Sequence, residues 1–191
     1  MAGETVGYSP VSIPKKNNGG RTKPKMANII IGRLRGVKKF PDVDAKGINI
    51  VGDIVLDEGE KAINLEVTAS TIAVTQASEG DPDNKGVKQK LEFSRPGSDD
   101  IAFEEFAENN VNEDLFAILQ YQGSPVKKVL GYPGNPLQFM IESTDNNEGD
   151  TNKVTLESVL RGRRIAFYEG VLPAIEGVTP PPAGSGSGQS V

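Results

Sequence analysis

The stretch TQASEGDPDNKGVKQKLEFSRPG (residues 75–97) contains the clearest fold signal in the chain, because a turn-rich segment leads directly into a regular alternation. In the second half of the stretch, Leu91 and Phe93 alternate with Lys90 and Glu92. A period of two residues is typical of a β-strand with one buried and one exposed face. The Gly, Pro, Asp and Asn residues before it are typical of a turn. The stretch therefore predicts a β-hairpin.

The same period of two recurs along the chain, which predicts a mainly β fold. Further strands are expected at residues 26–36, 47–56, 63–70, 136–143, 153–160 and 163–170. Residues 114–122 fit either a short buried strand or the end of a helix. In residues 63–70 the inward positions are odd-numbered and end at Ala69, whereas Ile72 and Val74 in the next segment are even-numbered, so a bulge or bend is expected between Ala69 and Ile72.

One α-helix is expected in the middle of the chain, at about residues 98–109. Ser98 is a suitable N-cap, and Asp100 in the first turn would interact favourably with the helix dipole. Phe103 and Phe106 form an apolar stripe on one side. The sequence therefore predicts strands, a single flanking helix, and then more strands.

The chain ends are irregular in composition, so we expect one domain at residues 26–170 between two arms. Residues 171–191 form a tail rich in Pro, Gly and Ser. Residues 1–25 lack periodicity and form a basic arm on a chain whose net charge is −5. The basic residues of this arm are Lys15, Lys16, Arg21, Lys23 and Lys25. The arm is either a docking element for an acidic surface, such as a neighbouring copy, or a solvated tail.

The residue content excludes most catalytic chemistry. The chain has no Cys and no His, which removes thiol nucleophiles, disulfides and any catalytic triad that needs a histidine. The loop at residues 145–150 resembles a calcium loop only superficially, because Asp150 and Leu156 stand where an EF-hand needs Gly and Glu. Glu104, Glu105 and Glu108 fit a solvated helix face. We therefore expect no enzyme activity, no catalytic residue, no cofactor and no bound metal.

Two charged segments are candidates for contact between subunits. The loop at residues 76–86 is longer than most hairpin loops, and the run RGRR at residues 161–164 is basic. The candidate contact residues in these segments are Glu79, Asp81, Asp83, Arg161, Arg163 and Arg164. The basic residues of the N-terminal arm are expected to pair with the three carboxylates across a subunit boundary. RGRR could also bind a phosphate, and a hairpin turn facing solvent or a partner is the alternative interpretation.

The chain shows no sign of membrane insertion, because no apolar run approaches the length of a transmembrane helix and the N-terminus lacks a secretory pattern. Outside the basic arm, acidic residues outnumber basic ones, so the domain itself is poorly suited to binding nucleic-acid phosphates.

Several segments resemble the major tail tube proteins of bacteriophages, in particular phages that infect Bacteroidota. The resemblance covers about residues 47–170. It is carried by IAVTQASEGDPDNKG (72–86), QKLEFSRPG (89–97), NEDLFAIL (112–119), GNPLQFMIESTDNNEGDTNKVTLES (134–158) and FYEG (167–170). Neither the basic arm nor the Gly/Ser tail matches the family.

The resemblance implies a β-sandwich or half-barrel with one flanking helix, whose copies form hexameric rings that stack into a tube. The partners would be further copies of the chain and other tail proteins, in a virion tail assembled in the host cytoplasm. DNA would pass through a net acidic lumen without sequence-specific binding. The alternatives are another virion role, as head decoration, tail terminator or connector protein, and a β-sandwich binding module.

Overall fold

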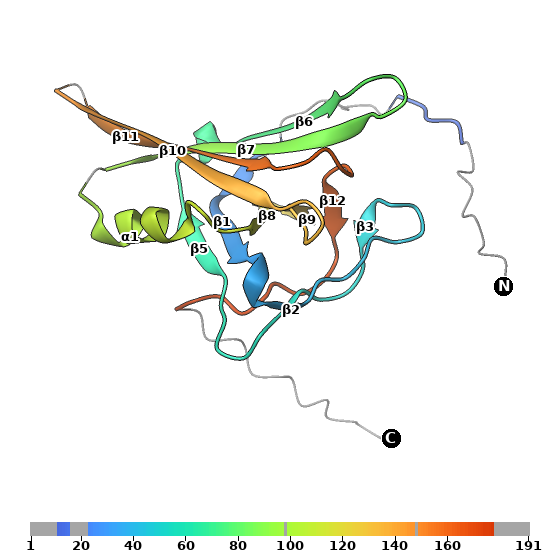
Figure 1. Cartoon of the computed structure of the whole chain (residues 1–191), viewed down its shortest axis with the longest axis horizontal. Coiled ribbons are helices and arrows are strands. Elements are labelled where there is room, and N and C mark those ends of the chain that lie inside the picture. The colour runs from blue at the N-terminus through green and yellow to red at the C-terminus, as the bar shows by residue number, and fades with distance from the viewer. Residues whose placement is uncertain (1–10, 16–22, 98, 148, 178–191) are drawn as a thin grey trace.

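The computed structural model describes residues 11–15, 23–97, 99–147 and 149–177, and it confirms the predicted mainly β fold with one helix among these residues (Figure 1). Four long strands form an upper sheet in the order β6–β7–β11–β10. These strands are β6 (Ala73–Glu79), β7 (Gly86–Pro96), β10 (Leu137–Asn146) and β11 (Gly149–Ser158). All neighbouring pairs in this sheet are antiparallel.

A lower sheet packs beneath the upper one in the order β5–β1–β8–β9–β12–β3. Its strands are β5 (Ile63–Glu66), β1 (Lys25–Arg33), β8 (Leu115–Tyr121), β9 (Ser124–Leu130), β12 (Ala166–Tyr168) and β3 (Asn49–Ile50). The sheets are joined at one corner, where Leu115 of β8 pairs with Leu137 of β10. β2 (Val37–Lys39) and β4 (Val55–Leu56) form a separate small sheet.

The first hydrophobic core fills the space between the two sheets. Its largest buried side chains include Ile29, Ile31, Leu91, Phe93, Leu115, Leu119, Phe139, Val154 and Leu156. The helix α1 (Ile101–Asn110) closes one end of this core with its apolar stripe. The rings of Phe106 and Phe139 lie 5.6 Å apart in an edge-on arrangement, which is favourable for aromatic pairs. The helix therefore packs beneath β10.

A second core lies on the opposite face of the lower sheet. Phe116 and Ile118 of β8 point into it, whereas Leu115 and Leu119 of the same strand point into the first core. Burial on both faces explains why residues 115–119 are continuously apolar. A continuous apolar run does not distinguish a strand from a helix, so the sequence left both possible. The structure resolves this alternative in favour of a strand.

The second core is covered by irregular segments instead of by another long sheet. Residues 47–56 were expected to form one strand, and this prediction is wrong. Only Asn49–Ile50 and Val55–Leu56 are strand, because Gly52 between them has φ +118° and turns the chain. Ile48 is 47% exposed, although a continuous strand would place it on the same face as the buried Ile50 and Ile54.

The C-terminal segment completes this cover, so the packed chain continues beyond the predicted boundary at residue 170. Leu172 and Ile175 pack against the second core. The backbone N–H of Ala62 donates to Ala174 O, and the N–H of Glu176 donates to Ala62 O. Only the part of the predicted tail after residue 177 lies outside the described residues.

The helix begins later than predicted, and its N-cap is a different residue. The side chain of Asp100 accepts hydrogen bonds from the backbone N–H groups of Ala102 and Phe103. Ser98, the predicted cap, lies outside the described residues. Asp100 also accepts a hydrogen bond from Arg95, and this bond, together with that from Phe103, lowers the pKa of the Asp100 carboxyl.

The hairpin predicted from residues 75–97 is present, but its loop is shorter than expected. Strands β6 and β7 pair without a shift from Ala73↔Glu92 to Glu79↔Gly86, so only residues 80–85 form the loop, in place of 76–86. The predicted phase change before β6 is also present. A single turn of 3₁₀ helix at Ala69–Thr71 supplies the bend, and it leaves Ala69 exposed where an inward position was expected.

We expect truncation after Gly170 to destabilise the domain and truncation after Gly177 to leave it intact. The first change removes Leu172 and Ile175 from the second core, and each partly buried side chain contributes about 1–2 kcal/mol. Chemical denaturation of both truncated proteins checks this. Equal midpoints would show that the C-terminal segment adds no stability.

We expect Asp100→Ala to lower the melting temperature at pH 7, with a smaller effect near pH 2. The lowered pKa means that the carboxylate is favoured in the folded state. The contribution of the Asp100 carboxylate to the free energy of unfolding is therefore complete above its pKa of about 4 in the unfolded state. It is lost as pH falls through the lower pKa of the folded state. Asp100→Asn, which keeps a capping oxygen, is the control. A difference between wild type and Asp100→Ala that does not depend on pH would contradict this account.

Candidate functional site

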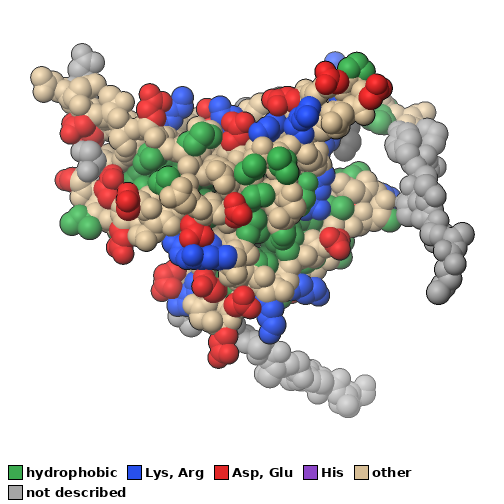
Figure 2. Space-filling view, in the orientation of Figure 1, with side chains coloured by type: hydrophobic (Ala, Val, Ile, Leu, Met, Phe, Trp, Pro, Cys, Tyr) green, Lys and Arg blue, Asp and Glu red, His purple; other side chains and the backbone are tan. Residues whose placement is uncertain are grey.

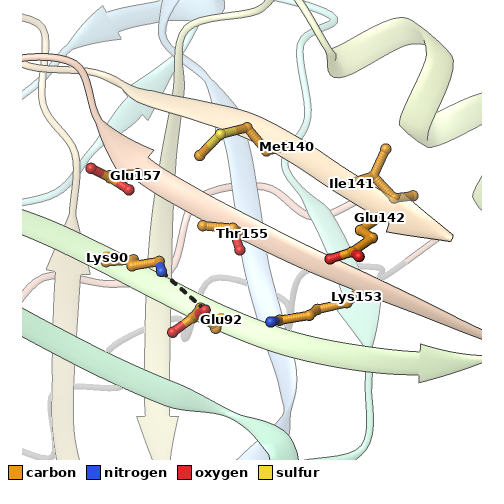
Figure 3. Close-up of a pocket in the computed structure, with 8 residues that line it drawn as sticks. All are labelled: Lys90, Glu92, Met140, Ile141, Glu142, Lys153, Thr155 and Glu157. Atoms are coloured by element: carbon orange, nitrogen blue, oxygen red, sulfur yellow. Dashed lines mark ion pairs between the residues drawn. The ribbon is translucent and has the colours of Figure 1, made fainter.

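The outer face of the upper sheet is polar and carries charges of both signs (Figure 3). Lys90 and Glu92 form an ion pair of 3.0 Å between Nζ and Oε1 on β7. In the strand register, Lys90 also lies opposite Glu157, and Lys153 of β11 lies opposite Glu142 of β10. Opposite charges at cross-strand positions stabilise a sheet, so these residues neutralise one another on its surface.

A shallow hollow of about 340 Å³ lies on this face, lined by these charged side chains together with Met140, Ile141 and Thr155. The carboxylate of Glu92 is already paired with a lysine in the same hollow. Within the described residues, no group of three or more His, Cys, Asp or Glu side chains is arranged to hold a metal ion. The hollow thus offers hydrogen bonds and balanced charge, which suit contact with another polar surface.

The two lateral edges of the upper sheet are open. In the described part of the chain, β6 pairs only with β7, and β10 pairs with β11 along its whole length but with β8 only at Leu137. Strand β6 has the sequence AVTQASE, with no Pro and a single charged residue, Glu79, at its end. Edge strands usually carry charges, prolines or bulges that prevent further pairing. The β6 edge has almost no such protection.

The three predicted acidic contact residues lie together at the exposed tip of the β6–β7 hairpin. Glu79, Asp81 and Asp83 are exposed, and Figure 2 shows acidic side chains at this end of the molecule. None of the three forms an ion pair with another described residue. Arg161 approaches the same loop, and its Nη1 donates to Asn84 O at 3.4 Å.

The segment RGRR is not the predicted hairpin turn. It connects β11 of the upper sheet to β12 of the lower sheet, and Gly162 forms an isolated bridge with Val87. The guanidinium of Arg163 lies 4.1 Å from the centre of the Tyr132 ring, and burial lowers its pKa. Arg163 therefore has an intramolecular role, whereas Arg164 is exposed.

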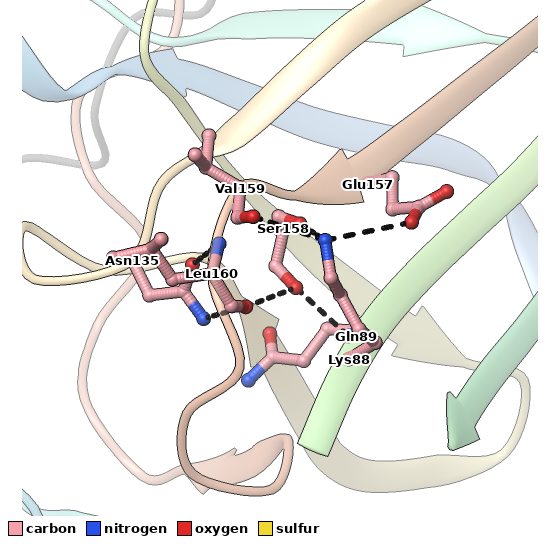
Figure 4. Close-up of polar contacts among 7 residues, drawn as sticks. All are labelled: Lys88, Gln89, Asn135, Glu157, Ser158, Val159 and Leu160. Atoms are coloured by element: carbon pink, nitrogen blue, oxygen red, sulfur yellow. Dashed lines mark hydrogen bonds and ion pairs between the residues drawn. The ribbon is translucent and has the colours of Figure 1, made fainter. Parts of the chain in front are cut away.

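Buried polar side chains hold this connecting segment in place (Figure 4). Asn135 forms two hydrogen bonds of 2.7 Å with the backbone of Leu160, one from its Nδ2 and one to its Oδ1. Ser158 Oγ accepts from the backbone N–H of Gln89 at 3.0 Å. A Cβ on Gly162 would lie 2.3 Å from the Tyr132 hydroxyl, so a larger residue there would displace the Tyr132 side chain.

Gln89 is the central member of this network, although it is not among the candidate residues predicted from the sequence. Its side-chain Nε2 donates to Arg163 O at 2.9 Å, and its Oε1 accepts from the N–H of Gly131 at 3.0 Å. The residue is 1% exposed. A signal was present, because Gln89 occupies an inward position of its strand, in phase with Leu91 and Phe93.

A basic groove lies beneath β6, between the edges of the two sheets. It is about 470 Å³ in volume and is lined by Lys23, Lys25, Val74, Gln76, Tyr121, Val126, Lys128 and Phe167. The Nζ of Lys128 lies 5.7 Å from the centre of the Tyr121 ring and 5.6 Å from that of Phe167. Such cation–π contacts hold an ammonium group in a defined position.

Part of the predicted basic arm therefore belongs to the domain. Lys25 begins β1 and pairs with Tyr121, and Lys23 lines the basic groove beside it. Lys15 is exposed. The other two predicted contact residues, Lys16 and Arg21, lie outside the described residues. Among the described residues the structure brings no arm lysine into an ion pair with the acidic hairpin tip, so pairing across a subunit boundary stays a prediction.

Comparisons with protein-family models, with curated proteins and with solved structures give no match for this chain. None of the helical segments that the structure describes has the length and apolar character needed to cross a bilayer. The features of the described residues that bear on function are therefore two open sheet edges, a charge-balanced outer face, an acidic hairpin tip and a basic groove.

We expect Gln89→Met to destabilise the domain, because it leaves the N–H of Gly131 and the carbonyl of Arg163 without partners. Each buried group that loses its hydrogen bond costs about 1–3 kcal/mol. Gln122→Met, at an exposed position, is the matched control. Urea denaturation of the two variants measures the difference. Similar stabilities would show that water replaces the lost partners.

Proposed function

We propose that this chain is a virion structural protein, a subunit of the rings that stack into a bacteriophage tail tube. The observation that carries the proposal is that, among the described residues, two edges of the upper sheet are open: β6 on one side, and β10 beyond its single pair with β8 on the other. An unprotected edge is a template for pairing with another chain. Since the two edges are different surfaces, pairing β6 of one copy with β10 of the next is heterologous, and such contacts generate closed rings when the rotation fits.

The layering of the domain suggests which face would line the lumen. In a ring made by joining upper sheets, one face of the joined sheet is bare and the other carries the lower sheet, the helix and the covering loops. The circumference available to each copy grows with distance from the axis. The bulkier layers therefore fit outside, and the bare face of Lys90, Glu92, Glu142, Lys153 and Glu157 fits inside.

On this proposal the lumen is charge-balanced, in contrast to the net acidic lumen expected from the resemblance. Each lysine in the centre of the face has a carboxylate beside or opposite it. Free cationic groups drive nonspecific binding of DNA phosphates. Lysines that are already neutralised by neighbouring glutamates offer little such attraction, which suits a channel through which DNA slides.

We expect the wild-type protein to form rings and tubes at moderate concentration and Ala77→Glu to reduce their formation. Ala77 lies on the β6 edge opposite Lys88, so the new carboxylate gains an intramolecular partner and the hairpin stays folded. A charge on the edge opposes the addition of another strand. Sedimentation velocity and negative-stain electron microscopy measure assembly.

Ala45→Glu is the matched control, because it makes the same change in an exposed turn next to β3 of the lower sheet, outside both edge strands. Thermal melting of both variants checks that the domain is intact. A wild-type protein that remains monomeric at every concentration would contradict the proposal. Normal tubes from Ala77→Glu would show that β6 does not form the ring contact.

A further inference from the structure

The helix α1 and the basic groove lie beneath opposite edges of the upper sheet. One row of inward-facing residues crosses the sheet from Val74 through Leu91 and Leu156 to Phe139, as the strand registers show. At the β10 end of this row, the Phe139 ring packs on Phe106 of α1. At the β6 end, Val74 lines the basic groove. A copy placed beside the β6 edge would therefore bring its α1 toward the groove.

The outward face of α1 is acidic, and its charge has no ion-pair partner among the residues that the structure describes. Glu104, Glu105 and Glu108 are exposed, and the helix contains no Lys or Arg. The ion pairs nearest in sequence, Arg95–Asp100 and Arg35–Glu113, lie outside the helix on either side. Within the described residues, none of the three glutamates forms a salt bridge.

The basic groove has the complementary property. Lys23, Lys25 and Lys128 converge on it, and none of them is paired with a carboxylate of the described residues. Lys128 is held between Tyr121 and Phe167, and Phe167 is 40% exposed. An uncompensated basic groove on a chain of net charge −5 is suited to an acidic partner surface.

We propose that the basic groove of one copy receives the acidic face of α1 from the adjacent copy in the ring. This inference rests on the proposed function, because it assumes that β6 and β10 of neighbouring copies lie side by side. A helix is about 10–12 Å across with its side chains, so the groove takes the ends of the glutamate side chains and not the helix itself. The carboxylates meet the lysine ammonium groups above the aromatic floor.

The contact would make ring formation directional and sensitive to salt. The two charged surfaces lie under different edges, so each copy presents one of each, and like-charged edges repel when a copy approaches in the wrong orientation. Because the charges are partly exposed, the attraction is screened over about 10 Å at 0.1 M salt and over about 3 Å at 1 M. Assembly should therefore weaken as salt concentration rises.

Charge reversal on each surface, alone and together, tests the contact. One variant carries Lys23→Glu and Lys128→Glu, a second carries Glu105→Lys and Glu108→Lys, and a third carries all four changes. We expect each of the first two to lower the ring fraction at least tenfold at low salt, and the third to restore it. Sedimentation velocity measures the ring fraction, and thermal melting shows that each variant is folded.

Lys38→Glu with Lys46→Glu is the matched control, because it makes the same change in net charge at exposed lysines outside the groove. Rings from the groove variant at the level of this control would overturn the inference and leave the proposed function intact. Failure of the fourfold variant to recover would also overturn it, because another partner would then occupy the groove. A wild-type protein that never assembles would overturn both proposals.

Discussion

The burial of β8 on both faces is the constraint on which the rest of the structure depends. Phe116 and Ile118 cannot be removed from water by the sheet that covers Leu115 and Leu119, because that sheet lies on the other side. A second apolar layer is therefore needed, and the chain supplies it with loops and its C-terminal segment. Since a buried strand must also pair its backbone, β8 is flanked by β1 and β9, which places the lower sheet around it.

The upper sheet differs from β8 because only one of its two faces is covered by a core. In the described part of the chain, one face is covered by the first core, whereas the other is bare and both edges are open apart from the single pair between β10 and β8. The long connection from β11 to β12 does not close either edge. It crosses to the lower sheet and is fixed there by Gln89, Asn135 and Ser158, whose hydrogen bonds are internal. The surfaces of the described residues that suit a partner therefore include the upper face, its edges and the surfaces beneath them.

The charged residues are distributed unevenly between the two edges and the bare face of the upper sheet. The net charge of the chain gives no hint that three exposed glutamates lie beneath one edge and three lysines beneath the other. The bare face between them contains both signs in neighbouring positions, as in the pair Lys90–Glu92. A molecule with complementary edges and a neutralised face is suited to lateral association with copies of itself, and this is the basis of both proposals.

The sequence by itself determined most of the long strands, the helix and the acidic hairpin tip, because these depend on local periodicity and turn chemistry that short segments carry. It did not predict β9 and left β8 open between strand and helix. It did not determine the partners of those elements. The predicted strand at residues 47–56 was broken by one glycine conformation, and RGRR became a crossing segment because its flanking strands belong to different sheets. The role of Gln89 and the basic groove likewise depend on residues far apart in the chain, such as Lys25 and Lys128. Only tertiary packing brings such residues together, since no local pattern records which strand will lie beside which.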